Sequence, residues 1–132
     1  MKHSWQKTFI TIYVGQAISI ITSSILGYAL IWYVTQETGS AAYLSLITFM
    51  TFLPRILLGP LAGSVIDRTE RKLIMITADV FVAVISFSMV IAATSIGSIP
   101  IWLILIVSFL RAVGSTFHEP TLQVVVAEIV PP

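Results

Sequence analysis

The feature that most constrains the fold of this chain is a run of 28 consecutive residues without a charge, from 8 to 35. A transmembrane helix needs about 20 predominantly apolar residues. Trp32 and Tyr33 lie near the end of the run, where aromatic side chains commonly meet lipid headgroups. A secretory signal peptide is excluded by length, because its apolar region is only about 7 to 15 residues long. We therefore expect a membrane-spanning helix over residues 8–35.

Three more apolar runs follow, at 41–66, 73–94 and 100–130, and short polar turns separate them. Of the 132 residues, 57% are hydrophobic and only 10% are charged, whereas soluble domains carry about 25% charged residues. So few charges cannot cover a surface in water, but they suit a surface in lipid. The sequence predicts an all-α membrane protein with four transmembrane helices and no separate soluble domain.

Prolines give expected boundaries within the fourth run. Pro100 suits the first turn of a helix. Pro120 removes one helical hydrogen bond, so we expect a kink or a break there. Pro131 and Pro132 are expected to end the helix.

The distribution of basic residues predicts the orientation of the chain. Lys2 and Lys7 precede the first span, Arg68, Arg71 and Lys72 follow the second, and the other two turns have no basic residue. Loops rich in Lys and Arg stay in the cytoplasm. We expect a multi-pass protein of the cell membrane, with the N-terminus and the 63–72 loop in the cytoplasm.

A few ionisable residues lie inside the predicted spans, namely Arg55, Asp79, Arg111, His118 and Glu119. A charge at the bilayer centre costs about 2.5 to 3.5 kcal/mol on insertion scales, so each should face protein or water. Structural ion pairs and roles in substrate or proton handling both remain open for the two arginines. Asp79 is expected to pair with a base at the inner mouth, and the histidine and glutamate are candidates for carrying protons.

A polar stripe runs along the first span, formed by Gln16, Ser19, Ser23 and Gly27 at spacings of three and four residues. Such a stripe either bonds to a neighbouring helix or lines a wet cavity. Together with Arg55, its polar members are the candidate residues of a substrate cavity.

Several kinds of chemistry lack their sequence signals. There is no Walker-type phosphate loop, no nucleophile elbow and no HExxH motif. The chain has no cysteine, and its two histidines, His3 and His118, are far apart in the sequence. The usual zinc-ligand patterns are therefore missing. A net charge of +1 offers no basic surface for nucleic acid. We expect a non-enzyme without catalytic residues, cofactor, metal or nucleic-acid partner.

The charged loop carries a pattern, Gly63-x-x-x-Asp67-Arg68-x-x-Arg71-Lys72, that resembles motif A of the major facilitator superfamily. That motif also lies between spans two and three. The resemblance implies a gating role in which Asp67 contacts the opposite half of the transporter. It also implies that Arg71 bonds Asp67 and an acid at the inner end of span four, for which Glu128 is the best candidate. Glu70 stands where the superfamily usually has glycine.

A second pattern, Arg111-Ala-Val-Gly114 followed by Phe117-His118-x-Pro120, resembles motif B and is similar to the macrolide efflux branch of the superfamily. Transporters of this type have twelve spans in two six-helix halves. The resemblance implies that this chain is an N-terminal fragment holding the first four helices, and that it does not transport alone. It further implies proton-coupled efflux of a drug or another small amphipathic molecule by alternating access. Arg111, Glu119 and Asp79 are then the candidates for proton coupling.

Two other functions are compatible with four spans. One is a stand-alone membrane subunit or scaffold, which needs no site. The other is a small multidrug transporter acting as a dimer, but that type relies on a glutamate within its first span, and residues 8–35 contain none.

Overall fold

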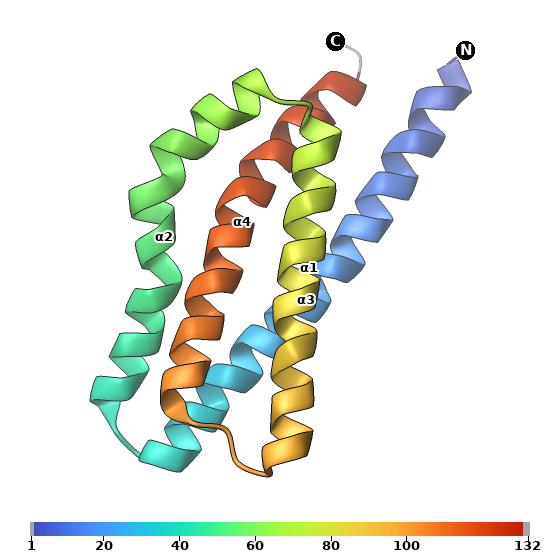
Figure 1. Cartoon of the computed structure of the whole chain (residues 1–132). Helices are drawn as coiled ribbons and strands as arrows, with labels where there is room; N and C mark the ends of the chain where they lie inside the picture. Colours follow the sequence, from blue (N-terminus) through green and yellow to red (C-terminus); the bar gives the residue numbers. More distant parts are fainter. Residues whose placement is uncertain (1, 131–132) are drawn as a thin grey trace.

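A computed structural model describes residues 2–130, which fold into four helices (Figure 1). These are α1 (Lys2–Thr38), α2 (Ala41–Arg68), α3 (Arg71–Ile96) and α4 (Ile101–Ile129). Each is long and apolar enough to cross a membrane. No strand occurs within the described range. The predicted all-α fold with four membrane-spanning helices is therefore confirmed.

Three of the four helices, α1, α2 and α3, extend beyond the apolar runs that predicted them. At 1.5 Å per residue, the 37 residues of α1 measure about 56 Å, well over the roughly 30 Å of bilayer hydrocarbon. Likewise α2 continues to Arg68 and α3 begins at Arg71, so only Thr69 and Glu70 connect them. Polar residues continue these helices because backbone hydrogen bonding does not end where the apolar side chains end.

Glycine ends the helices at the two other turns. Gly39 and Gly97 have φ angles of 57° and 77°, a left-handed conformation that glycine adopts without steric strain. The Gly39 N–H donates to the carbonyl of Thr35 at 2.9 Å, and that of Gly97 donates to the carbonyl of Ala93 at 3.3 Å. These bonds satisfy carbonyls that the helix ends would leave free.

Pro120 does not break α4, which is a correction to one of the two outcomes expected from the sequence. The helix is continuous from Ile101 to Ile129 with Pro120 inside it. The Thr121 hydroxyl donates to the Phe117 carbonyl at 2.6 Å and so supplies a local hydrogen bond beside the proline. Pro131 and Pro132, which were expected to end the helix, lie outside the described residues.

Helix α4 is the centre of the bundle and packs mainly against α2 and α3. α1 is inclined across these three helices and diverges from them toward its N-terminal end (Figure 1). The apolar core lies near the glycine turns and consists of Leu30, Val34, Ile47, Met89, Ile104 and Val107. Burying such side chains contributes about 1.5 to 3 kcal/mol each in water, but within lipid close packing supplies the stability instead.

The two ends of the bundle differ in chemistry. The start of α1, the charged α2–α3 turn and the end of α4 lie together at one end, and both glycine turns lie at the other (Figure 1). At the glycine-turn end, Tyr33 bonds the backbone of Ile99 twice. Its hydroxyl accepts from the Ile99 N–H at 3.1 Å and donates to the Ile99 carbonyl at 3.4 Å. The end of α1 is thereby tied to the α3–α4 turn.

Close packing of α3 on α4 depends on Gly114. A Cβ atom at this position would lie 2.5 Å from Cγ2 of Val82 and 3.2 Å from Cδ1 of Phe81. Gly114→Ala should therefore lower the free energy of unfolding by about 1 to 3 kcal/mol, because overpacking outweighs the better helix propensity of alanine. Thermal unfolding of the purified protein in detergent measures the change.

Val82→Ala in the same chain should restore most of the lost stability, since it removes the clashing methyl group. Gly15→Ala is the matched control, because no atom lies within 4 Å of the added Cβ. Equal stability of Gly114→Ala and Gly15→Ala would contradict this account of the α3–α4 contact.

Candidate functional site

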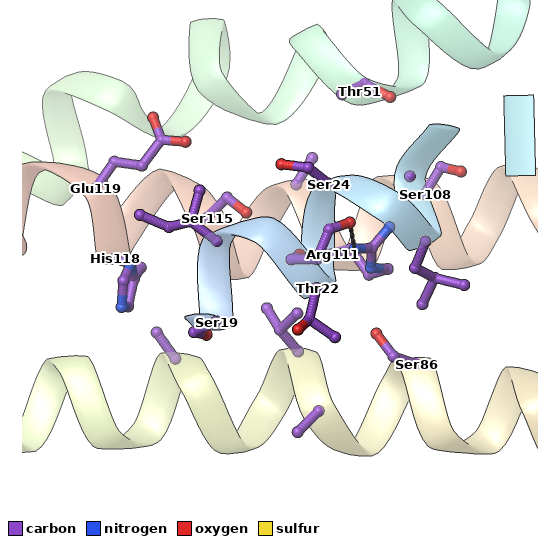
Figure 2. A pocket seen from close by; sticks show the side chains of 18 of the residues that line it. Ser19, Thr22, Ser24, Thr51, Ser86, Ser108, Arg111, Ser115, His118 and Glu119 are labelled. Atoms are coloured by element: carbon purple, nitrogen blue, oxygen red, sulfur yellow. Dashed lines mark hydrogen bonds between the residues drawn. The ribbon is translucent and has the colours of Figure 1, made fainter. Parts of the chain in front are cut away.

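A cavity of about 630 Å³ lies between the four helices and is lined by residues of all of them (Figure 2). Hydroxyl groups are frequent on its walls, and they alternate with apolar side chains. The hydroxyl-bearing residues are Ser19, Thr22, Ser23, Ser24, Tyr28, Thr51, Ser86, Ser108 and Ser115. All five ionisable residues expected within the spans also line this cavity, namely Arg55, Asp79, Arg111, His118 and Glu119.

The polar stripe of α1 faces inward. Ser19, Ser23 and Gly27 line the cavity. Gln16 does not line it but donates from Nε2 to Oδ2 of Asp79 at 3.5 Å, the long limit of a hydrogen bond. The stripe therefore does both things that the sequence left open, since part of it bonds a neighbouring helix and part of it lines the cavity.

Arg111 projects from α4 toward α1 and is held by Ser23 (Figure 2). Its Nη2 donates to the carbonyl and to the hydroxyl of Ser23, each at 2.7 Å. Only 9% of the residue is exposed, and its Nε is buried without a partner. A Cβ on Gly27 would lie 3.7 Å from Nη1 of Arg111, an ordinary van der Waals contact, so the guanidinium packs against this part of α1 without requiring glycine. Arg111 thus keeps an unused donor in the wall of the cavity.

Arg55 and Glu119 form an ion pair across α2 and α4. Nη2 of Arg55 lies 2.9 Å from Oε1 of Glu119, and the glutamate points toward α2 (Figure 2). The two side chains remain 42% and 54% exposed. The structural ion pair expected as one alternative for Arg55 is thus present, and both partners also line the cavity.

Asp79 of α3 meets His118 of α4. Nε2 of the histidine lies 3.1 Å from Oδ1 of the aspartate. The ring nitrogen forms no aligned hydrogen bond, so the two groups are in close contact, and the contact is an ion pair only when the histidine is protonated. His118 is 8% exposed. The base beside Asp79 is therefore a histidine from α4.

The charged turn contains a second contact between helices. Arg71, at the start of α3, forms a salt bridge with Glu128 near the end of α4. Within residues 2–130, Arg71 and Asp67 form no ion pair, in contrast to the contact that the resemblance implies. Asp67, Arg68 and Lys72 are exposed. The aspartate is thus accessible to a partner outside the described residues.

Two backbone features explain the residues of this turn. Glu70 has a φ of −61°, so its position needs no glycine. Gly63 lies within α2, and a Cβ there would meet no atom within 4 Å. Its small size therefore leaves an open surface on α2 and does not serve a contact within the described part of the chain.

Several lining residues were missed by reasoning from the sequence. Ser108 and Ser115 were not singled out, although they lie on α4 at helical spacing with Arg111 and Glu119, which were. This is the helical period, so the same search that found the stripe on α1 would have found a second stripe here. Ser86 lies seven residues after Asp79 on α3 in the same way.

Comparison with known proteins relates this site to transporters. A family model described as transmembrane secretion effector matches residues 4–132. The chain is 43% identical over 129 residues to macrolide efflux protein A of Streptococcus pyogenes, an alignment that covers 98% of this chain and 32% of that protein. It is 40% identical over 93 residues to macrolide efflux protein A of Enterococcus faecalis, covering 70% of this chain and 28% of that one.

The chain thus spans about a third of the length of the curated relatives that it matches. No solved structure matches it. The family match extends over nearly the whole chain, includes both the charged turn and the cavity, and agrees with four membrane-length helices. The chain therefore belongs to the transmembrane secretion effector family of the major facilitator superfamily.

Proposed function

We propose that this chain forms the N-terminal part of a secondary active transporter that expels a drug or another small amphipathic molecule from a bacterial cell. The observation that carries the proposal is a polar cavity between four membrane-length helices in a member of this family. The relatives named macrolide efflux protein A suggest a macrolide as the first substrate to test.

The cavity suits an amphipathic molecule of drug size. Its volume of about 630 Å³ falls within the roughly 300 to 1,000 Å³ of ligand pockets. Serine and threonine hydroxyls offer hydrogen bonds, while Ile20, Leu26, Ile31 and Val82 offer apolar contact. Arg111 adds a positive charge to the cavity wall.

Transport would proceed by alternating access, in which two halves rock about a site near the bilayer midplane. The described helices supply one wall of that site, and the remaining helices of the transporter supply the other. The start of α1 and the 63–72 loop lie on the cytoplasmic side in this proposal, because their basic residues favour that side.

The charged turn would act as the inner gate. The salt bridge between Arg71 and Glu128 ties α3 to α4 at the same end as the turn. Asp67 is exposed beside it and would bond the opposite half when the inner side is closed. With the two side chains 33% and 54% exposed, solvent screening limits the salt bridge to about 1 kcal/mol. That energy changes a two-state equilibrium about fivefold.

Efflux would be driven by protons that enter as the substrate leaves. Arg111, Glu119 and Asp79 are the candidate residues for this coupling, because all three line the cavity. Glu119 bonds Arg55, Arg111 bonds Ser23, and Asp79 contacts His118, so the three residues are not equivalent candidates for carrying a proton.

Filling the cavity should block efflux. Ser86→Trp places a large side chain on the cavity wall and should lower the initial efflux rate of a labelled macrolide at least tenfold in cells expressing the full-length protein. Ser88→Trp is the matched control on the same helix. Ser88 is exposed and is not among the lining residues, so its variant should keep most of the rate. Equal loss in both variants would contradict the cavity as the substrate site.

Breaking the inner salt bridge should slow efflux. Glu128→Gln removes the charge that Arg71 bonds, and we expect a decrease of up to about fivefold in the efflux rate, in line with about 1 kcal/mol. The charge-exchanged pair Arg71→Glu with Glu128→Arg should recover part of the rate. Glu70→Gln, which alters a neighbouring acid without a salt bridge in the described chain, should have little effect. A Glu128→Gln rate equal to wild type would exclude the gating role.

A further inference from the structure

One contact between two ionisable residues of the cavity involves neither Arg55 nor Arg111. Asp79 and His118 face each other from α3 and α4 at 3.1 Å, and both line the cavity. Figure 2 shows His118 on the side of α4 that faces α3, while Glu119, its neighbour in sequence, points the other way toward α2. Two adjacent residues of α4 therefore contact two different helices.

The other charged groups on the walls are fixed by their contacts. Glu119 bonds the Arg55 guanidinium, a charge-assisted bond that protonation of the carboxylate would remove. Arg111 bonds Ser23, and a guanidinium does not release its proton in proteins. Among the described residues that line the cavity, only His118 belongs to a type whose charge ordinarily changes between pH 5 and 8.

A third helix joins this contact. Gln16 of α1 donates to the second carboxylate oxygen of Asp79, and the other amide atom of Gln16, Oε1, is buried without a partner. A change of charge at the histidine and aspartate is therefore felt by α1, α3 and α4 together. Such a junction is where a bound proton could alter how the helices pack.

We propose that His118 and Asp79 together bind the coupling proton, and this inference rests on the proposed function. In the loaded state a proton taken from water resides on the His118 imidazole, which then forms an ion pair with the Asp79 carboxylate. In the unloaded state a neutral imidazole lies beside the carboxylate, and no other covalent bond changes. The residue that holds the proton is thus histidine, and Asp79 stabilises its charge.

The charges of the cavity link this proton to the substrate. With His118 neutral, the lining holds two guanidinium groups, of Arg55 and Arg111, and two carboxylates, of Asp79 and Glu119, so their formal charges cancel. Loading the proton makes the same lining positive by one charge. A cationic substrate is then repelled, and it is accepted again when the proton leaves. Mutual exclusion of this kind exchanges one proton for one substrate.

The test uses the purified full-length transporter in lipid vesicles with two measurements. Counterflow of a labelled macrolide at equal pH on both sides measures transport itself. Uptake driven by a pH gradient measures coupling. His118→Gln should lower the gradient-driven rate at least tenfold more than the counterflow rate. His3→Gln removes the other histidine of this chain and should retain both rates.

Two further variants keep the test informative if His118→Gln is poorly produced. Asp79→Asn removes the carboxylate that faces the imidazole, so the pH profile of gradient-driven uptake should shift. Exchanging the residues, Asp79→His with His118→Asp, should restore a gradient-driven rate above that of either single variant. A purely structural role for the pair would not move the pH profile.

Three results would overturn the inference. The first is an equal loss of both rates in His118→Gln, together with an unchanged pH profile in Asp79→Asn. The second is selective loss of gradient-driven uptake in Glu119→Gln instead. The third is a wild-type protein that shows counterflow but no response to the gradient, which contradicts proton-driven efflux and this inference but leaves transport of the substrate standing. A wild-type protein without counterflow contradicts the proposed function, and the inference is lost with it.

Discussion

The arrangement of this bundle depends on how charges are kept out of hydrocarbon. Each of the five ionisable residues that line the cavity has a polar partner on a different helix: Arg55 with Glu119, His118 with Asp79, and Arg111 with Ser23. An unpaired charge costs several kcal/mol in such surroundings, so these contacts restrict which helices can be neighbours and in which rotation. They all lie on the cavity wall, and the residues that specify the bundle are thus also those available to a substrate or a proton.

Helix α4 contributes one residue to each of these polar contacts. It is the most buried helix, and it sends Arg111 toward α1, His118 toward α3 and Glu119 toward α2. At its end Glu128 reaches the start of α3. Since α4 contacts every other helix through a polar group, a shift of α4 cannot occur without changing at least one of these contacts. This is the physical basis for linking chemistry inside the cavity to the charged turn at the end of the bundle.

Much of the fold could be predicted from the sequence because its signals are local. Run length and charge content predicted four helices, and the short polar turns expected between the runs are present at Gly39 and Gly97. The partners within the membrane could not be predicted in this way. Arg55 could have paired with either Asp79 or Glu119, and the choice follows from α2 packing on α4, which is a tertiary fact. The break considered at Pro120 was wrong: α4 continues through this proline, which removes only one of the hydrogen bonds of a 29-residue helix. The serines of α4 were missed because its charged residues were considered singly and not as members of one face.

The double hydrogen bond between Tyr33 and the backbone of Ile99 has a mechanical consequence. It fixes one end of a 37-residue helix, while the opposite end diverges from the bundle. If α1 rotates slightly about Tyr33, the residues of α1 that lie far from Tyr33 are displaced more than those close to it. Ser23 lies ten residues from Tyr33 and Gln16 seventeen, about 15 and 26 Å along the helix axis. The contact of Gln16 with Asp79 would thus be stretched more than that of Ser23 with Arg111, so tilting of α1 would open the bundle from its charged end first.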